Sequence, residues 1–131
     1  MTDHTTPETS KRLKEAGFPQ PGFEVGQFFV DPKDEVSIVI VQVGSSRIYW
    51  QSMDRYYDFG SFKIGDPDSG FFVFRPTATD ILKELPGYTI HYKAKDGTWA
   101  VWSYQPDDLM FQNANPAEAA ALAWLARNKK K

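Results

Sequence analysis

The chain has 131 residues, a formal charge of −2 and an aromatic fraction of 15%, which together predict an ordinary folded protein rather than a disordered chain. A slightly acidic chain lacks the basic surface that general nucleic-acid binding requires, and the absence of cysteine excludes disulfides, thiol nucleophiles and iron–sulfur ligation. Two histidines, His4 and His91, are too few for a multi-histidine metal site.

The polar first residues predict a flexible tail over residues 1–9, without the apolar core of a secretory signal. Ser10 is then a candidate cap for a short helix over residues 11–16, whose Leu13 would face the interior. Gly17 suits the left-handed residue that often ends a helix.

Strand-forming residues and turn residues then alternate as far as residue 74, in the pattern of successive hairpins. The predicted strands cover residues 23–30, 35–43, 47–53 and 71–74, while residues 56–63 fit either a further strand or an irregular loop. No stretch reaches the roughly 18 apolar residues of a membrane helix, so we expect a cytoplasmic protein with no membrane partner.

A middle helix is predicted to begin after Thr77, because Thr77 and Asp80 have the spacing of a capping box. Its apolar side would carry Ile81, Leu82 and Leu85, and the following proline and glycine end it.

Asp96 and Gly97 form the strongest hairpin signal of the chain and predict that residues 88–93 pair with residues 99–104. Residues 109–112 fit a last short strand.

The final helix is predicted over residues 117–127, with Asn115 as its cap, Pro116 at its first position and Glu118 completing a capping box. Its apolar stripe consists of Ala117, Ala120, Ala121, Trp124 and Leu125.

These elements predict an α+β fold, in which short N-terminal, middle and C-terminal helices pack on a mainly antiparallel sheet. We expect one domain over residues 10–128 and a frayed basic end at residues 129–131.

Catalytic motifs are missing from the sequence. No serine lies in a G-x-S-x-G elbow, there is no glycine-rich phosphate loop, and His91 lies within a predicted strand, where a surface role is the ordinary one. Residues 66–70 begin like a calcium loop but lack its later ligands. We therefore expect a protein that is not an enzyme and holds no metal or cofactor.

Aromatic and arginine residues concentrate in residues 47–75, which contain nine aromatic residues and three of the five arginines in 29 positions. Aromatic rings stack on nucleobases, and guanidinium groups bind phosphate through two parallel hydrogen bonds. The predicted ligand-binding residues are Arg47, Tyr49, Trp50, Arg55, Tyr56, Tyr57 and Arg75. The same residue types also suit a protein interface, and aromatic residues in a small β-rich protein also serve as its core.

Three segments carry a resemblance to a known group of proteins. PTATDILKELPG (residues 76–87), NPAEAAALAWL (residues 115–125) and TSKRLKEAGFPQ (residues 9–20) resemble segments of small bacteriophage and prophage proteins of uncharacterised function. The resemblance does not extend to residues 31–73, and it transfers no catalytic residue. It implies a phage-encoded protein that acts by binding.

The leading hypothesis is a non-catalytic protein that sequesters a nucleotide-type immune signal, as an anti-defence sponge in the host cytoplasm. Such a protein would often be a homo-oligomer, because a pocket between subunits buries its ligand more fully. The alternative is an interaction module that inhibits a host protein or serves phage assembly. A hydrolase of a nucleotide signal, with His91 or a carboxylate as its base, is a third hypothesis.

Overall fold

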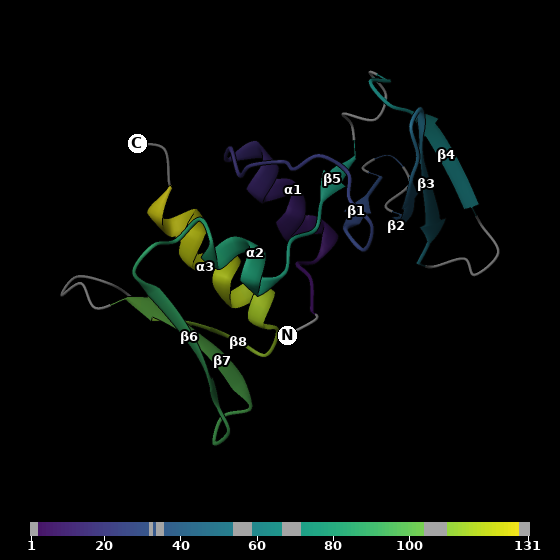
Figure 1. Ribbon diagram of the computed structural model, residues 1–131. Coiled ribbons are helices and arrows are strands. Elements are labelled where there is room, and N and C mark those ends of the chain that lie inside the picture. Colours follow the sequence, from purple (N-terminus) through teal and green to yellow (C-terminus); the bar gives the residue numbers. More distant parts are fainter. Residues whose placement is uncertain are drawn as a thin grey trace. The chain divides into compact units, whose positions relative to one another are not determined.

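A computed structural model describes residues 3–31, 33, 36–53, 59–66, 72–103 and 110–128. The chain divides into two compact units (Figure 1): unit 1 is formed by Met1–Gly17 and Pro76–Lys131, and unit 2 by Phe18–Arg75. Unit 2 is thus an insertion in the sequence of unit 1. The α+β class with antiparallel sheets is confirmed, but the single domain expected over residues 10–128 is replaced by two units that each contain one sheet.

Unit 1 contains all three helices and a three-stranded sheet (Figure 1). Its elements are α1 (Pro7–Glu15), α2 (Ala78–Leu82), β6 (Tyr88–Lys93), β7 (Thr98–Ser103), β8 (Phe111–Asn113) and α3 (Pro116–Arg127). The antiparallel strands have the order β6-β7-β8. Helix α3 contacts β7 and β8 as well as α1 and α2, so it is the central element of this unit.

The alanines of α3 explain how one helix packs against so many neighbours. The predicted stripe is buried at Ala117, Ala120, Ala121 and Trp124, although Leu125 remains half-buried. Ala119 and Ala123, which lie off that stripe, are also buried. Small side chains allow other elements to approach the helix closely, and α3 is therefore covered on more than one side.

Two predictions for the N-terminal segment are wrong. Helix α1 begins at Pro7 with Thr6 as its cap, so residues 3–9 are structured rather than a flexible tail. Ser10 is not a cap but a buried residue whose hydroxyl hydrogen-bonds Thr5 Oγ1 at 2.6 Å and the carbonyl of Thr6 at 2.7 Å. The segment is further held by a hydrogen bond of 3.0 Å from Thr5 N to the carbonyl of Pro76.

Glu118 differs from its prediction as well. The side chain of Asn115 caps α3 as expected. The backbone N–H of Asn115, however, donates to Asn113 Oδ1 at 2.9 Å rather than to the Glu118 side chain. The Glu118 carboxylate instead accepts hydrogen bonds from Thr9 Oγ1 at 2.7 Å and from Thr6 N at 3.3 Å. It therefore binds the first turn of α1 to the first turn of α3.

Two further local predictions for unit 1 are confirmed, whereas the basic end at residues 129–131 lies outside the described residues. Thr77 and Asp80 form a reciprocal capping box, with hydrogen bonds of 3.0 and 3.2 Å. β6 and β7 pair around a turn in which Gly97 has a φ of +67°, a left-handed conformation that favours glycine.

Unit 2 is a five-stranded antiparallel sheet with the order β4-β3-β2-β1-β5 (Figure 1). Its strands are β1 (Phe28–Val30), β2 (Ser37–Val43), β3 (Arg47–Ser52), β4 (Phe59–Lys63) and β5 (Val73–Phe74). The strands expected over residues 23–30 and 71–74 are shorter than predicted, and a strand rather than an irregular loop occupies residues 59–63.

Phenylalanine rings form the interior of unit 2. Phe23 lies 4.7 Å from Phe29 and 4.9 Å from Phe62 between ring centroids, and Phe29 lies 5.5 Å from Phe74. Phe29, Phe62 and Phe74 are buried and Phe23 is half-buried. The burial of Phe62 and Phe74 agrees with the core interpretation of the aromatic segment. Phe59 is different, because 63% of it is exposed.

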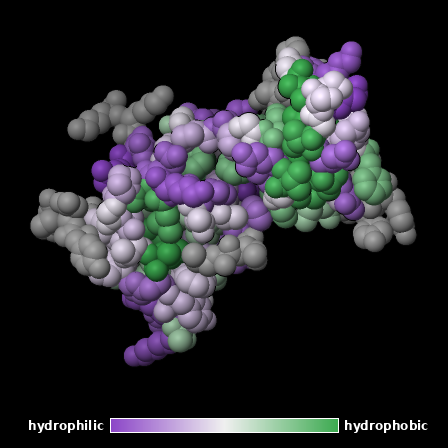
Figure 2. Space-filling model, in the orientation of Figure 1, coloured by the Kyte–Doolittle hydropathy of each residue, from purple (hydrophilic) through white to green (hydrophobic). Residues whose placement is uncertain are grey.

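Hydrophobic side chains also reach the surface of both units (Figure 2). In unit 2 they include Val41, Val43, Phe59 and Ile64.

Replacing Glu118 by alanine is expected to lower the free energy of unfolding by about 0.5–1.5 kcal/mol, because the exposed Thr6 amide and the half-buried Thr9 hydroxyl lose their acceptor. Alanine is the better helix former, so helix propensity would not cause the loss. The exposed Glu84 provides the control, and Glu84→Ala should change stability little. Urea unfolding followed by circular dichroism measures both, and equal losses would contradict the role given to Glu118.

Gly60 is expected to tolerate no side chain. A Cβ atom at Gly60 would overlap the benzene ring of the Trp50 indole, whereas a Cβ at Gly22 would have no neighbour within 4 Å. Gly60→Ala should therefore destabilise unit 2 by about 1–3 kcal/mol through displacement of the indole, and Gly22→Ala should not. Chemical unfolding monitored by tryptophan fluorescence compares the two variants.

Candidate functional site

Four of the seven predicted ligand-binding residues can be placed. Arg47, Tyr49 and Trp50 belong to β3, and Arg75 follows β5. The other three, Arg55, Tyr56 and Tyr57, lie outside the described residues.

Alternation along β3 separates Trp50 from Arg47 and Tyr49. Ile48 and Ser52 are buried and share one face of the sheet with Trp50. Trp50 pairs with Gly60 of β4, and its ring covers that glycine. Its role is therefore to fill the space above Gly60, and the expectation that it contacts a ligand is not supported by this position.

Arg47 and Lys63 face each other across β3 and β4. They are direct cross-strand partners in the register and both line a hollow of about 420 Å³ at the end of the β2–β3 hairpin. We call this hollow the hairpin hollow. It is lined by Ser45, Ser46, Arg47, Lys63 and Ile64. Arg47 Nε donates to Ser61 Oγ at 3.1 Å, which orients the guanidinium along the sheet surface.

No carboxylate neutralises these two cations among the residues that the structure describes. Like charges on directly opposed cross-strand positions destabilise a sheet. An anion in the hairpin hollow would remove this repulsion, and the hydroxyls of Ser45 and Ser46 are further hydrogen-bond donors there.

Tyr49 supplies an aromatic ring beside the hairpin hollow. It lies two residues after Arg47 and therefore on the same face of β3, and 39% of it is exposed. Its Cε2 atom is 3.9 Å from the position of a Cβ built on Gly44, so the ring leans back toward the hairpin turn. Arg47 and Tyr49 thus lie on the same face of β3, although Tyr49 is not part of the lining of the hairpin hollow.

Arg75 does not belong to this site. Its Nη1 donates to Ser37 Oγ at 2.6 Å, and Ser37 is the first residue of β2, whereas the hairpin hollow follows the last residue, Val43. A strand of that length spans about 20 Å. Arg47 and Arg75 therefore cannot contact the same small ligand.

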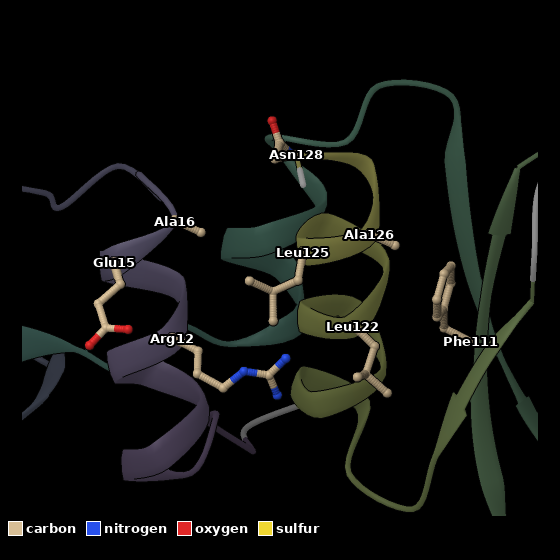
Figure 3. Close-up of a pocket in the computed structure, with 8 residues that line it drawn as sticks. All are labelled: Arg12, Glu15, Ala16, Phe111, Leu122, Leu125, Ala126 and Asn128. Atoms are coloured by element: carbon tan, nitrogen blue, oxygen red, sulfur yellow. The ribbon is translucent and has the colours of Figure 1, made fainter. Parts of the chain in front are cut away.

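A second hollow was not predicted from the sequence. It lies in unit 1, has a volume of about 600 Å³, and is formed beside α3 by residues of α1, β8 and α3 (Figure 3). We call this hollow the α3 groove. It is lined by Arg12, Glu15, Ala16, Phe111, Leu122, Leu125, Ala126 and Asn128. The one available signal was Leu122, a large apolar residue outside the predicted stripe of the helix.

Comparison of the chain with protein-family models, curated proteins and solved structures finds no match. Within the described ranges, no three His, Asp or Glu side chains gather as a metal site would require. None of the helices there has the length and apolar character needed to cross a membrane.

Reversing one charge of the cation pair should stabilise unit 2. Lys63→Glu places a carboxylate opposite Arg47 and is expected to raise the free energy of unfolding by about 0.2–1 kcal/mol at low salt, because repulsion becomes attraction. Salt should reduce the gain through screening. Urea unfolding at two salt concentrations measures it, with Lys63→Gln as the intermediate case, and a gain that salt leaves unchanged would argue against a charge effect.

Proposed function

We propose that this protein binds a small nucleotide-type anion at the hairpin hollow and retains it without chemical change. The observation that carries the proposal is the pair formed by Arg47 and Lys63, two opposed cations with no carboxylate partner in the described parts of the chain. A pyrophosphate group, or the two phosphodiesters of a cyclic dinucleotide, supplies two negative charges to such a pair, and a guanidinium binds phosphate through a fork of two donors.

Tyr49 supports a nucleotide over a simple inorganic anion. Its partly exposed ring lies on the same face as Arg47, where a base can stack on it while the phosphate occupies the hollow. Stacking of one base on an aromatic side chain is worth about 1–3 kcal/mol.

The biological role that fits this binding is sequestration. The resemblance of three segments to small phage proteins, together with the missing catalytic motifs, supports a phage-encoded anti-defence sponge for a nucleotide-type immune signal in the host cytoplasm. A homo-oligomer would enclose the open hollow more completely and so slow the release of the ligand.

An interaction module remains the second candidate, because one observation favours it. β4 is an edge strand of its sheet, and Phe59 on that strand is 63% exposed. Edge strands pair readily with other chains, and exposed aromatic residues are frequent hot spots of interfaces. This role would be favoured if Phe59→Ser abolished capture of one stoichiometric host protein.

Thermal shift and calorimetry with cyclic dinucleotides, cyclic trinucleotides and cyclic ADP-ribose isomers test the main proposal. At least one of them is expected to stabilise the protein and to be recovered intact afterwards. Arg47→Gln and Lys63→Gln should each weaken its binding by about tenfold, because each removes a charge-assisted hydrogen bond. The matched control is Lys33→Gln, which removes an exposed positive charge of unit 2 outside the hollow.

A second comparison separates the contribution of the Tyr49 ring to binding from that of the Arg47 and Lys63 charges. Tyr49→Ser should weaken nucleotide binding but leave the affinity for inorganic pyrophosphate unchanged. Absence of binding by every nucleotide would overturn the proposal, and a hydrolysed ligand would favour the hydrolase hypothesis instead.

A further inference from the structure

The α3 groove combines an apolar lining with two charged side chains, Arg12 and Glu15 (Figure 3). Leu122, Leu125 and Phe111 provide most of its apolar side-chain atoms, and Leu122 is 37% exposed there. Large apolar residues that surround a hollow of several hundred Å³ are typical of sites for small organic molecules.

The guanidinium of Arg12 is the polar group that gives the groove its chemical character. Figure 3 shows Arg12 reaching from α1 toward α3, while the carboxylate of Glu15 points to the other side of α1. In the described parts of the chain, Arg12 has no carboxylate partner. An unpaired guanidinium beside leucine side chains is most favourably neutralised by an anionic group on an otherwise apolar ligand.

Asn128 lies at the opposite end of the groove from Arg12 (Figure 3). Its Nδ2 donates to the carbonyl of Trp124 at 2.9 Å, so the side chain is held in place. The six-residue separation between Leu122 and Asn128 corresponds to about 9 Å along a helix, which gives the scale of a ligand that would lie along α3.

We propose that the α3 groove is a binding site for a small amphiphilic monoanion, such as a medium-chain carboxylate. The carboxylate would bind Arg12, and the aliphatic chain would cover Leu122, Leu125 and Phe111. The volume of about 600 Å³ lies within the range of about 300–1,000 Å³ that small-molecule sites occupy. A partner helix fits less well, because it needs a longer series of apolar anchors than these three side chains offer.

Calorimetric titration of the full chain with decanoate, decanol and acetate tests this site. Decanoate is expected to bind with one-to-one stoichiometry, decanol more weakly, and acetate without measurable affinity. Arg12→Gln should weaken decanoate by about tenfold and leave decanol unchanged, because only the carboxylate uses the guanidinium. Leu122→Ser should weaken both, because both ligands bury their chains.

Two control variants distinguish a specific effect of Arg12 from a general loss of charge and from misfolding. Lys95→Gln removes an exposed charge of unit 1 in the turn between β6 and β7 and should change nothing. Arg12→Lys retains the charge and should bind decanoate with intermediate affinity, which excludes simple misfolding of the Arg12 variants. No saturable decanoate binding, or binding that Arg12→Gln leaves unchanged, would overturn the proposal, and it would do so independently of any result at the hairpin hollow.

Discussion

The carboxylate of Glu118 is the contact on which unit 1 depends. It accepts hydrogen bonds from Thr6 and Thr9, which lie more than a hundred residues away in the sequence. Beside this contact, Asn115 Nδ2 donates to the carbonyl of His4 at 3.0 Å, which also joins the N-terminal segment to the start of α3. The α3 groove exists because α1 is held beside α3, so the same carboxylate indirectly positions Arg12.

Local signals made a large part of the fold predictable. A capping box, an Asp-Gly turn and a proline at the first position of a helix act through contacts of only a few residues, and the middle helix, the β6–β7 hairpin and α3 follow them. The burial of Phe62 and Phe74 agrees with one of the interpretations that the sequence left open for the aromatic residues, because burial of large apolar rings stabilises a small sheet.

Non-local contacts limited the rest. Glu118 was assigned to a capping box, yet its carboxylate accepts from Thr9, which is 109 residues away in the sequence. Ser10 was assigned as a cap, but the helix begins earlier, after Thr6, and the Ser10 hydroxyl hydrogen-bonds Thr5 and Thr6 nearby. In the candidate site, Arg47 and Trp50 are close in sequence but lie on opposite faces of β3. Their separation follows from the alternation of side chains along a strand, which a grouping by residue type does not take into account. Arg75 was grouped with Arg47 by composition, although the length of β2 separates them.

The two hollows differ in a way that makes their ligands distinguishable. In the hairpin hollow, two cations and two hydroxyls lie together, so the favoured ligand carries more than one negative charge and several acceptor oxygens. In the α3 groove, one guanidinium stands among leucine and phenylalanine side chains, and a ligand with many charges would lose hydration there without finding enough donors. Additional negative charges on a ligand therefore favour the hairpin hollow, whereas additional apolar surface on a ligand favours the α3 groove. A polyphosphate is suited to unit 2, and an amphiphilic monoanion is suited to unit 1.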